Sequence, residues 1–445
     1  MVGLRRALGF WEATLAGVGV ILGAGIYALI GAAAGEAGNA VWLSMAIAAV
    51  VAGLTGLSYA ELSSMLPRAG AEFTYADKAF GKRIAFLIGW LLAVAGVIAA
   101  AAVALGFGGY LHALAGAPVA AAAVLLVAAS TAVLLVGVKE SARLAVVFTV
   151  IEAAGLLIIL FAALPFLGSV DYFAAPAGIA GVFGAAALIF FAFIGFEDVS
   201  RLAEETRDAP KTIPRALLAA LAISTVLYAL VAVAAVSVLG WQALGASNAP
   251  LADVASHALG PNGFLILAFI ALFSTSNTVV MVQLAASRVL YGMGRGHAMP
   301  SFLGAVHPKT QVPWLATIVI GVFAALFALV EKISVVADLT NFAVFIVFIV
   351  VNLSVIKLRH SAPRMPRPFK MPLNIGWFPV LPALGVVSCL VLFASLGVDI
   401  LVGGALVVLA GVCLDFFMEA RHGPKRWVEE HAKHLLTSLR IKRFR

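Results

Sequence analysis

The sequence predicts an all-α polytopic membrane protein with about twelve transmembrane helices. Its 445 residues are 63% hydrophobic and only 11% charged, whereas a soluble domain of this size needs a far more polar exterior. Hydropathy gives about twelve apolar runs that are long enough to cross a bilayer, for which a helix needs roughly 20 residues. Two of these runs are interrupted by glycine near their middle, a pattern typical of membrane proteins built from inverted repeats.

The order of the apolar runs gives the expected elements. Prolines mark several of their ends, because Pro67 follows the second run and Pro118 opens the fourth. No stretch has the composition of a separate soluble domain, so we expect one transmembrane domain over residues 1–420 and a basic tail over residues 421–445. The expected spans lie near residues 10–34, 40–66, 84–113, 118–137, 143–165, 178–200, 215–240, 262–291, 313–330, 333–356, 377–397 and 399–418.

The basic residues test this count. With the N-terminus inside, every Lys and Arg except Lys332 falls in a cytoplasmic segment, as the positive-inside rule requires. We therefore expect a multi-pass protein of the plasma (inner) membrane with both termini cytoplasmic. The same distribution explains the net charge of +8 without a nucleic-acid partner. The tail interleaves apolar and basic residues, so it either lies on the anionic lipids of the inner leaflet or remains solvated.

The first apolar run contains five glycines between Gly17 and Gly31, and each costs a helix about 1 kcal/mol relative to alanine. Because residues 23–25 form a Gly-Ala-Gly sequence near the middle of the run, we expect a broken helix whose free backbone groups bind a solute. Helix packing through the GxxxG spacing of Gly19 and Gly23 is the alternative. The spacing does not fit a dinucleotide fingerprint. The preceding Arg5 and the small-residue end also resemble a signal peptide, but the many similar runs that follow favour an uncleaved span.

The sixth apolar run has a second interruption, where Gly195 is followed at once by Glu197 and Asp198. An interrupted span five positions after the first is the pattern of a five-plus-five inverted repeat, in which the two breaks face each other. The repeats are expected over residues 10–165 and 178–356, with two extra C-terminal spans over 377–418.

Four motifs, in this order, resemble the amino acid–polyamine–organocation superfamily, and in particular its permeases for cationic and neutral amino acids. They are Gly-Val-Ile-Leu-Gly-Ala-Gly-Ile-Tyr at 19–27, Tyr-Ala-Glu-Leu-Ser-Ser-Met-Leu-Pro-Arg-Ala-Gly at 59–70, the region from Phe191 to Arg215, and Ala-Ser-Arg-Val-Leu-Tyr-Gly-Met at 286–293. The resemblance implies a leucine-transporter-like fold with broken helices 1 and 6, alternating access, and amino acids or polyamines as substrates.

The physical chemistry of the two breaks suits such a substrate. The second half of span one offers free amides at a positive dipole end, which suit a carboxylate, and bare carbonyls at the other broken ends suit an ammonium group. By resemblance, Phe191 is the aromatic lid over the substrate, with ordinary core packing as the alternative. The expected substrate-binding residues are Gly23, Ala24, Gly25 and Ile26 for the carboxylate, and Val20, Ile21, Phe191, Phe193 and Ile194 for the ammonium group.

Ionisable groups at membrane depth are costly, so Glu152 and Glu197 are candidates for coupling. Nothing in the sequence neutralises Glu152, and a carboxylate kept from water favours its protonated form, so we expect it to bind a proton. Ser274 and Ser276 would supply hydroxyl oxygens to the same region, and such oxygens would also suit a sodium ion. The alternative is that both serines form helix–helix hydrogen bonds. The alternative for Glu197 is a salt bridge with a basic residue. Glu61 is expected to pair with a loop arginine, and Asp338 is expected to be solvated.

These observations favour a secondary active amino-acid transporter that is coupled to protons. A sodium-coupled symporter, an obligate amino acid or polyamine exchanger, and an amino-acid sensor with a transporter fold are the alternatives. We expect no enzyme, metal or cofactor, because the eight histidines lie in or near loops and the tail, without metal-ligand spacing. A repeated pore motif typical of channels is also missing. The side-chain preference stays open, since apolar residues favour neutral substrates and the two glutamates favour cationic ones.

Overall fold

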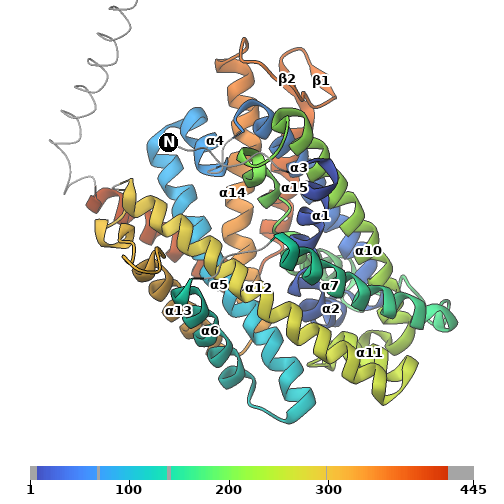
Figure 1. Ribbon diagram of the computed structural model, residues 1–445. Coiled ribbons are helices and arrows are strands. Elements are labelled where there is room, and N and C mark those ends of the chain that lie inside the picture. The colour runs from blue at the N-terminus through green and yellow to red at the C-terminus, as the bar shows by residue number, and fades with distance from the viewer. Residues whose placement is uncertain (1–7, 68–70, 138–141, 297, 419–445) are drawn as a thin grey trace, which may run out of the picture.

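Long helices make up almost the whole chain in the computed structural model, which describes residues 8–67, 71–137, 142–296 and 298–418 (Figure 1). The expected all-α polytopic class is confirmed. The expected basic tail over 421–445 lies outside the described residues. The helices are α1 (Phe10–Ile21), α2 (Ala24–Ala37), α3 (Val41–Met65), α4 (Ala71–Phe80), α5 (Lys82–Ala115), α6 (Val119–Val136), α7 (Ala142–Ala163), α8 (Gly178–Ile189), α9 (Asp198–Arg201), α10 (Ala209–Ala246), α11 (Pro250–Leu259), α12 (Pro261–Arg295), α13 (Trp314–Ala328), α14 (Ile333–Ser361), α15 (Val380–Ala394) and a last helix, Val398–Met418.

The helices account for each of the twelve expected spans. In the described part of the chain, nine helical stretches are long and apolar enough to cross a bilayer, and one of them, Ala24–Met65, joins α2 to α3. Three shorter apolar helices, α1, α13 and α15, supply the first half of span one and spans nine and eleven. Spans one and six are each interrupted, as the glycines predict.

Three elements outside the spans were not predicted from the sequence. Helix α4 follows span two, and helix α11 lies between spans seven and eight. A short antiparallel hairpin of β1 (Asn374–Ile375) and β2 (Phe378–Pro379) lies in the proline-rich loop before α15. Figure 1 shows α4 and the hairpin toward one end of the helical bundle and α11 at the other, and we call these the α4 end and the α11 end.

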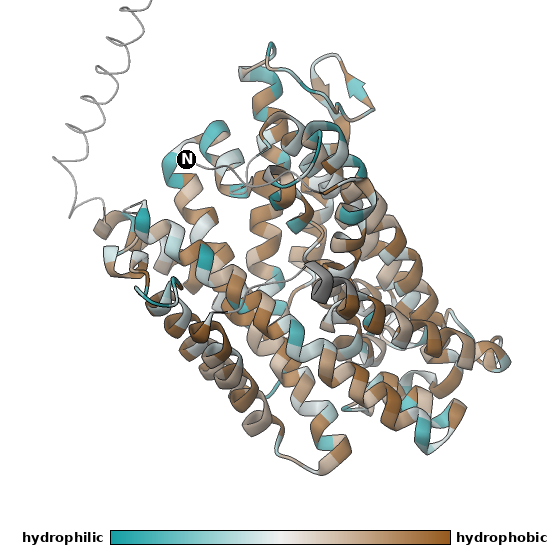
Figure 2. Cartoon of the chain, in the orientation of Figure 1, coloured by the Kyte–Doolittle hydropathy of each residue, from teal (hydrophilic) through white to brown (hydrophobic). Residues whose placement is uncertain are grey.

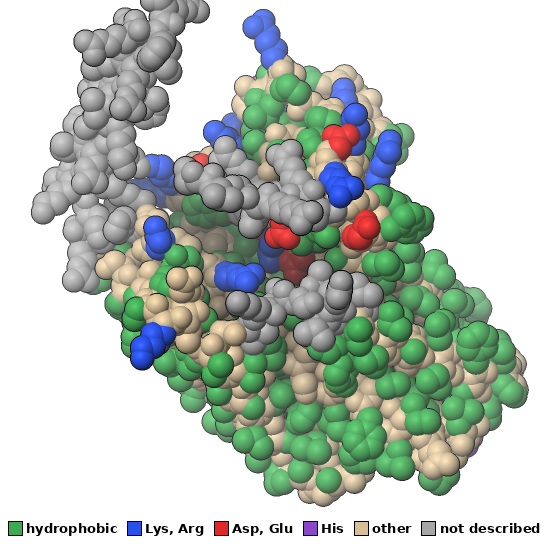
Figure 3. Space-filling view, viewed as in Figure 1, with side chains coloured by type: hydrophobic (Ala, Val, Ile, Leu, Met, Phe, Trp, Pro, Cys, Tyr) green, Lys and Arg blue, Asp and Glu red, His purple; other side chains and the backbone are tan. Residues whose placement is uncertain are grey.

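The two ends differ in polarity. Figure 2 shows hydrophobic residues along the helices and hydrophilic ones concentrated around α4 and the hairpin. Lys, Arg, Asp and Glu side chains gather at the α4 end in Figure 3, around a hollow in the surface, while the opposite half of this face is largely hydrophobic.

Both broken spans have one end at the α4 end of the bundle. Leu8, just before α1, forms a parallel bridge with Thr206, just after the sixth span. The Leu8 amide donates to the Glu205 carbonyl at 3.1 Å, and the Arg207 amide donates to the Leu8 carbonyl at 2.9 Å. The start of span one is therefore attached to the end of span six, so the two spans run in opposite directions.

Glu61 of α3 anchors the loop before α15. Its carboxylate is fully buried and pairs with Arg359 of α14, with 2.5 Å between Oε2 and Nη2, and Arg367 of the loop lies 3.5 Å from Oε1. The Met371 amide donates to Oε2 at 3.0 Å. The expected pairing of Glu61 with a loop arginine is confirmed, and these contacts attach α3 to α14 and to the loop before α15.

Candidate functional site

The break in span one is short. Helix α1 ends at Ile21 and α2 begins at Ala24, so only Leu22 and Gly23 interrupt the helix. The Ala24 amide donates to the hydroxyl of Thr278 in α12 at 3.2 Å. The first amides of a helix have no partner within it, so those of Gly25 and Ile26 remain as donors at the positive end of α2.

Tyr228 of α10 joins the two breaks. Its fully buried hydroxyl donates to the Ile21 carbonyl and lies 3.3 Å from the Ala192 carbonyl. The Ile21 carbonyl, expected to be bare, therefore already has a donor. A buried carbonyl without a partner is costly, which explains why a tyrosine reaches the point where both helices lose their regular pattern.

The break in span six is longer and partly supports itself. After α8 the chain forms a 3-10 segment, Phe190–Phe193, and resumes an α-helix only at Asp198. The Phe191 carbonyl accepts the Ile194 amide at 3.2 Å, and the Phe193 carbonyl accepts the Phe196 amide at 3.4 Å. These two carbonyls are therefore less available than the sequence suggests.

Two expected carbonyl acceptors differ from the others. Within the described chain, the carbonyls of Val20 and Ile194 accept no backbone hydrogen bond beyond the regular helix pattern. Val20 lies beside Gly195, because a Cβ on Gly195 would lie 2.6 Å from Val20 Cγ1. Gly195 has φ +114°, a conformation that favours glycine. Val20 of the first break therefore lies against the residue that follows Ile194 in the second.

Gly25 permits the backbones of the two breaks to touch. A Cβ placed on Gly25 would lie 2.6 Å from the Cα of Ala192 and 3.0 Å from its Cβ. Real Cβ atoms do not approach other atoms so closely, so a larger residue would push the breaks apart. Close packing therefore requires glycine at position 25, and the role of Gly25 in substrate binding stays a prediction. At Gly19 the same construction overlaps the side chain of Thr149 in α7, which indicates packing.

The four aromatic residues at the break in span six, over residues 190–197, divide into three with ring partners and one without. Phe190 packs on Phe345, Phe193 packs on Tyr228, and Phe196 packs on Tyr59, with ring centroids 4.8, 5.4 and 5.7 Å apart. Phe191 makes no ring contact with an aromatic side chain in the described ranges, and it is buried. Ile26, another expected binding residue, is also buried. Ile194 is half-buried. The lack of a ring partner leaves Phe191 suited to contact something other than the aromatic core.

Glu152 of α7 is an unpaired buried carboxylate beside span one. It is 1% exposed, and Ser274 and Asn277 of α12 are the polar side chains that face its carboxylate. Its Oε1 atom and the Ser274 hydroxyl nevertheless lack hydrogen-bond partners among the residues described. The Tyr27 hydroxyl of α2 donates to the Glu152 carbonyl at 2.6 Å.

The other two coupling candidates are engaged locally. The hydroxyl of Ser276 donates to the Leu272 carbonyl of its own helix at 2.7 Å. Glu197 is buried, and its Oε2 atom accepts the Gly195 amide at 2.9 Å, so it stabilises the break. Arg201 pairs with Asp198 at 2.5 Å and with Glu72 of α4 at 3.0 Å. The ion pairs of the described chain therefore do not include the salt bridge that was the alternative for Glu197.

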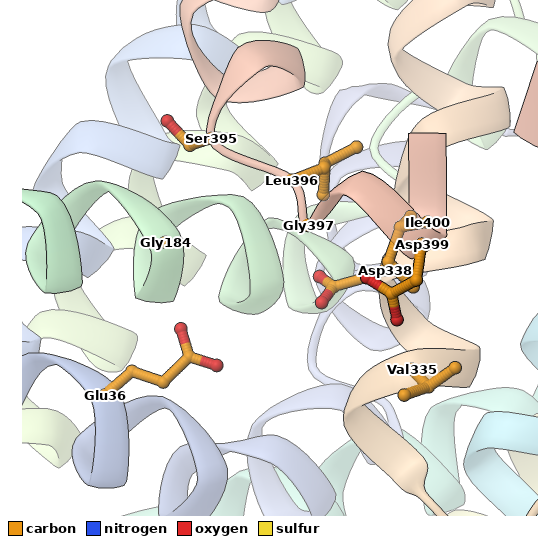
Figure 4. Close-up of a pocket in the computed structure, with 9 residues that line it drawn as sticks. All are labelled: Glu36, Gly184, Val335, Asp338, Ser395, Leu396, Gly397, Asp399 and Ile400. Atoms are coloured by element: carbon orange, nitrogen blue, oxygen red, sulfur yellow. The ribbon is translucent and has the colours of Figure 1, made fainter. Parts of the chain in front are cut away.

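A separate cavity of about 210 Å³ lies near the far end of α2, away from the breaks (Figure 4). Three carboxylates line it, from Glu36, Asp338 and Asp399. Asp338, expected to be solvated, is half-buried and lines this cavity, and its Oδ1 atom is buried without a hydrogen-bond partner in the part of the chain described. Among the residues that the structure describes, no group of three or more His, Cys, Asp or Glu residues is arranged to hold a metal ion.

Sequence comparison gives the family of the chain. A model of the amino acid permease family matches residues 8–406. The chain belongs to the amino acid permease family. This permease is 32% identical to the branched-chain amino acid permease BcaP of Bacillus subtilis, over 94% of both chains. It is 33% identical to an uncharacterized transporter of Mycobacterium tuberculosis, over 97% of this chain and 93% of the relative. It is also 31% identical to the vacuolar cationic amino acid transporter 2 of Arabidopsis thaliana, over 81% of this chain and 61% of that protein.

The sequence interpretation missed Thr278, Tyr228 and Asn341, three polar side chains that contact the breaks from spans eight, seven and ten. A polar residue inside an apolar span is a signal for function or for helix contacts, and each of the three met that criterion. The sequence does not give the partners of these side chains. Those of Thr278 and Asn341 lie more than a hundred residues away along the chain.

Proposed function

We propose that this permease is a secondary active amino-acid transporter that works by alternating access and is coupled to protons. The observation that carries the proposal is the meeting of unlike backbone groups at the two breaks. The amides of Gly25 and Ile26 lie at the start of α2, and the carbonyls of Val20 and Ile194 accept no backbone hydrogen bond beyond the helix pattern in the described residues. An amino acid presents a carboxylate and an ammonium group, the two charges that such donors and acceptors bind.

The expected binding residues take different parts in this proposal. Gly23, Ala24, Gly25 and Ile26 form the start of α2, but the Ala24 amide also serves Thr278. Val20 and Ile194 supply the acceptors, while the carbonyls of Ile21, Phe191 and Phe193 are shared with donors of the protein. The Phe191 ring covers the substrate. Among the described aromatic side chains at the break in span six, it is the one without a ring partner.

A neutral, apolar side chain fits this site better than a cationic one. Glu197 is occupied by the Gly195 amide, and Glu152 is 1% exposed, so neither carboxylate is presented to a substrate side chain. The resemblance to a branched-chain amino acid permease over nearly the full length supports this choice, whereas the relation to a cationic amino acid transporter keeps basic amino acids and amines as the alternative. A binding screen with leucine, isoleucine, lysine and putrescine distinguishes the two classes.

The exposure of residues around the breaks fits one state of an alternating-access cycle. Val20 lies beside the break in span six, yet it is 44% exposed. Tyr27, Ile30 and Tyr110, which lie beyond that break, are fully buried. Access from the α4 end, where the surface is hollowed in Figure 3, is consistent with this difference. The basic residues at that end support a cytoplasmic location for it, with both termini cytoplasmic and the protein in the plasma (inner) membrane.

Glu152 is the residue that we assign to coupling. A carboxylate desolvated at membrane depth is stabilised by a proton, and α7 packs on the first half of span one, so the protonation state and the position of α1 influence each other. Sodium is a specific second candidate, because Glu152 Oε1 and Ser274 Oγ are both oxygen atoms without a partner in the described chain. An obligate exchanger is the third.

Uptake into proteoliposomes under separately imposed proton and sodium gradients tests the assignment. We expect uptake to follow an inward proton gradient and to be unchanged when choline replaces sodium. Glu152→Gln should remove the dependence on the proton gradient while leaving exchange largely intact, and Glu12→Gln at the exposed start of α1 serves as the control. Strict sodium dependence would overturn proton coupling, indifference to both gradients would indicate an exchanger, and no counterflow of labelled amino acid would favour a sensor.

A further inference from the structure

Asn341 of α14 supports the point where span six loses its helical pattern. Its side chain is fully buried, and its Nδ2 atom donates to the carbonyls of Ala187 at 2.7 Å and Leu188 at 3.1 Å. These carbonyls belong to the last turn of α8, where an α-helix leaves acceptors without their regular i+4 donors, and the Phe190 amide also points toward the Leu188 carbonyl. The amide of Asn341 therefore takes the place of backbone donors that the break removes.

The orientation of this amide follows from chemistry. Only the NH₂ group of an asparagine can face two carbonyl oxygens, because its own oxygen would repel them. The Oδ1 atom consequently points away from the break, and it has no hydrogen-bond partner in the described part of the chain. Asn341 thus acts here through its donor group, while its acceptor group is unused. An unpaired buried acceptor is costly, so a position that served packing alone would favour a better matched side chain.

The face of α14 that carries Asn341 also holds the aromatic core of span six. Phe345 and Phe348 follow at helical spacing and pack on Phe190, with ring centroids 4.8 and 5.9 Å apart. Asn352, farther along the same face, bonds to α3 instead: its Nδ2 atom donates to Thr55 Oγ1 at 3.0 Å, and its Oδ1 atom accepts the Ser58 hydroxyl at 2.6 Å. The helix therefore contains two buried asparagines, only one of which contacts the break.

We propose that Asn341 is a positioning residue that holds the break of span six in the geometry required for substrate binding. The inference rests on the proposed function, because it assumes that the substrate lies at this break. Without the donor, the carbonyls of Ala187 and Leu188 must find other partners, and the 3-10 segment after them shifts. The shift moves the Phe191 ring and the free carbonyl of Ile194 away from the amides of α2.

Asn341→Leu tests this role, because leucine has a similar size and no donor. We expect the affinity for leucine, measured by scintillation proximity in detergent, to fall about tenfold, because the variant removes the side-chain donor of both buried carbonyls. Hydrogen–deuterium exchange of peptides covering residues 190–197 should also become faster. Asn352→Leu is the matched control: it should lower thermal stability, yet leave the affinity and the exchange of residues 190–197 unchanged.

Asn341→Asp separates the donor role from a direct contact with the substrate. An ionised aspartate repels the two carbonyls, and a protonated one donates a single hydrogen bond, so binding should be weak at alkaline pH and partly restored as the pH falls. If Oδ1 instead held the substrate ammonium, Asn341→Asp would bind as tightly as the wild type or more tightly at alkaline pH, which would overturn the positioning role. Unchanged exchange of residues 190–197 in Asn341→Leu would also overturn it. Faster exchange with unchanged affinity would leave Asn341 supporting the break but would contradict the proposed substrate site.

Discussion

The two breaks of this permease solve the same problem in different ways. Span one is interrupted only at Leu22 and Gly23, and its loose groups are bound by side chains of other helices, Thr278 and Tyr228. Span six is irregular over residues 190–197, and it bonds mainly to itself through 3-10 turns and through Glu197. Among the contacts described, its external side-chain donors are Asn341, at the end of α8, and Tyr228, which it shares with span one.

From this difference we expect the break in span six to adapt and the break in span one to stay fixed. A short break between two helices leaves the amides of α2 in fixed directions, which suits recognition of a carboxylate. A longer segment of 3-10 turns has weaker hydrogen-bond geometry and shifts more easily, which suits a part that closes over a substrate. Three substitutions, with Gly19→Leu as a comparison for the first, sharpen this difference, and we order them by the size of the expected effect.

Gly25→Leu should have the largest effect. The added side chain would overlap the backbone of Ala192, so the two breaks cannot approach, and we expect substrate binding to be lost. Equilibrium binding and size-exclusion profiles in detergent measure affinity and folding. Gly53→Leu is the control, since a Cβ on Gly53 meets nothing within 4 Å and binding should persist. Full affinity in a folded Gly25→Leu protein would remove the carboxylate site from α2.

Gly19→Leu provides a second comparison within the same glycine-rich run. The leucine side chain would collide with Thr149 of α7 and not with the break in span six. The substitution should therefore lower thermal stability before it affects substrate binding.

Tyr228→Phe should have an intermediate effect. The change removes the donor shared by the carbonyls of Ile21 and Ala192, and leaving buried carbonyls unpaired costs about 1–3 kcal/mol. We expect lower thermal stability together with weaker substrate binding, because both breaks lose the same partner. Tyr75→Phe is the matched control, since the Tyr75 hydroxyl is buried without a hydrogen-bond partner in the described ranges. Equal losses in the two variants would mean that Tyr228 acts only through packing.

Phe191→Ala should have the smallest effect on folding and a moderate effect on substrate retention. Phe191 lacks the ring contacts that hold Phe190, Phe193 and Phe196, so its removal opens the site without dismantling the aromatic core. The dissociation rate of labelled substrate should rise, whereas in Phe193→Ala stability should fall first. If dissociation and exchange rates in Phe191→Ala both match the wild type, Phe191 belongs to the core.

The sequence by itself determined the class of the protein, the number of spans and the positions of both breaks. These features depend on local properties: the length of apolar runs needed to cross a bilayer, the distribution of basic residues, and the helix-weakening effect of Gly23, Gly25 and Gly195. For the same reason it missed α4 and α11, which lie outside the spans and have no strong hydropathy signal.

Only the tertiary structure decided which backbone groups at the breaks remain free. The carbonyl of Ile21 and the amide of Ala24 look as available in sequence as those of Val20 and Gly25, but Tyr228 and Thr278 reach the first two from other helices. The structure also showed that Glu197 binds the Gly195 amide while Glu152 Oε1 has no partner in the described chain. Hydrogen bonds act over about 3 Å, so the state of each group depends on residues that the fold brings together and that sequence spacing does not reveal.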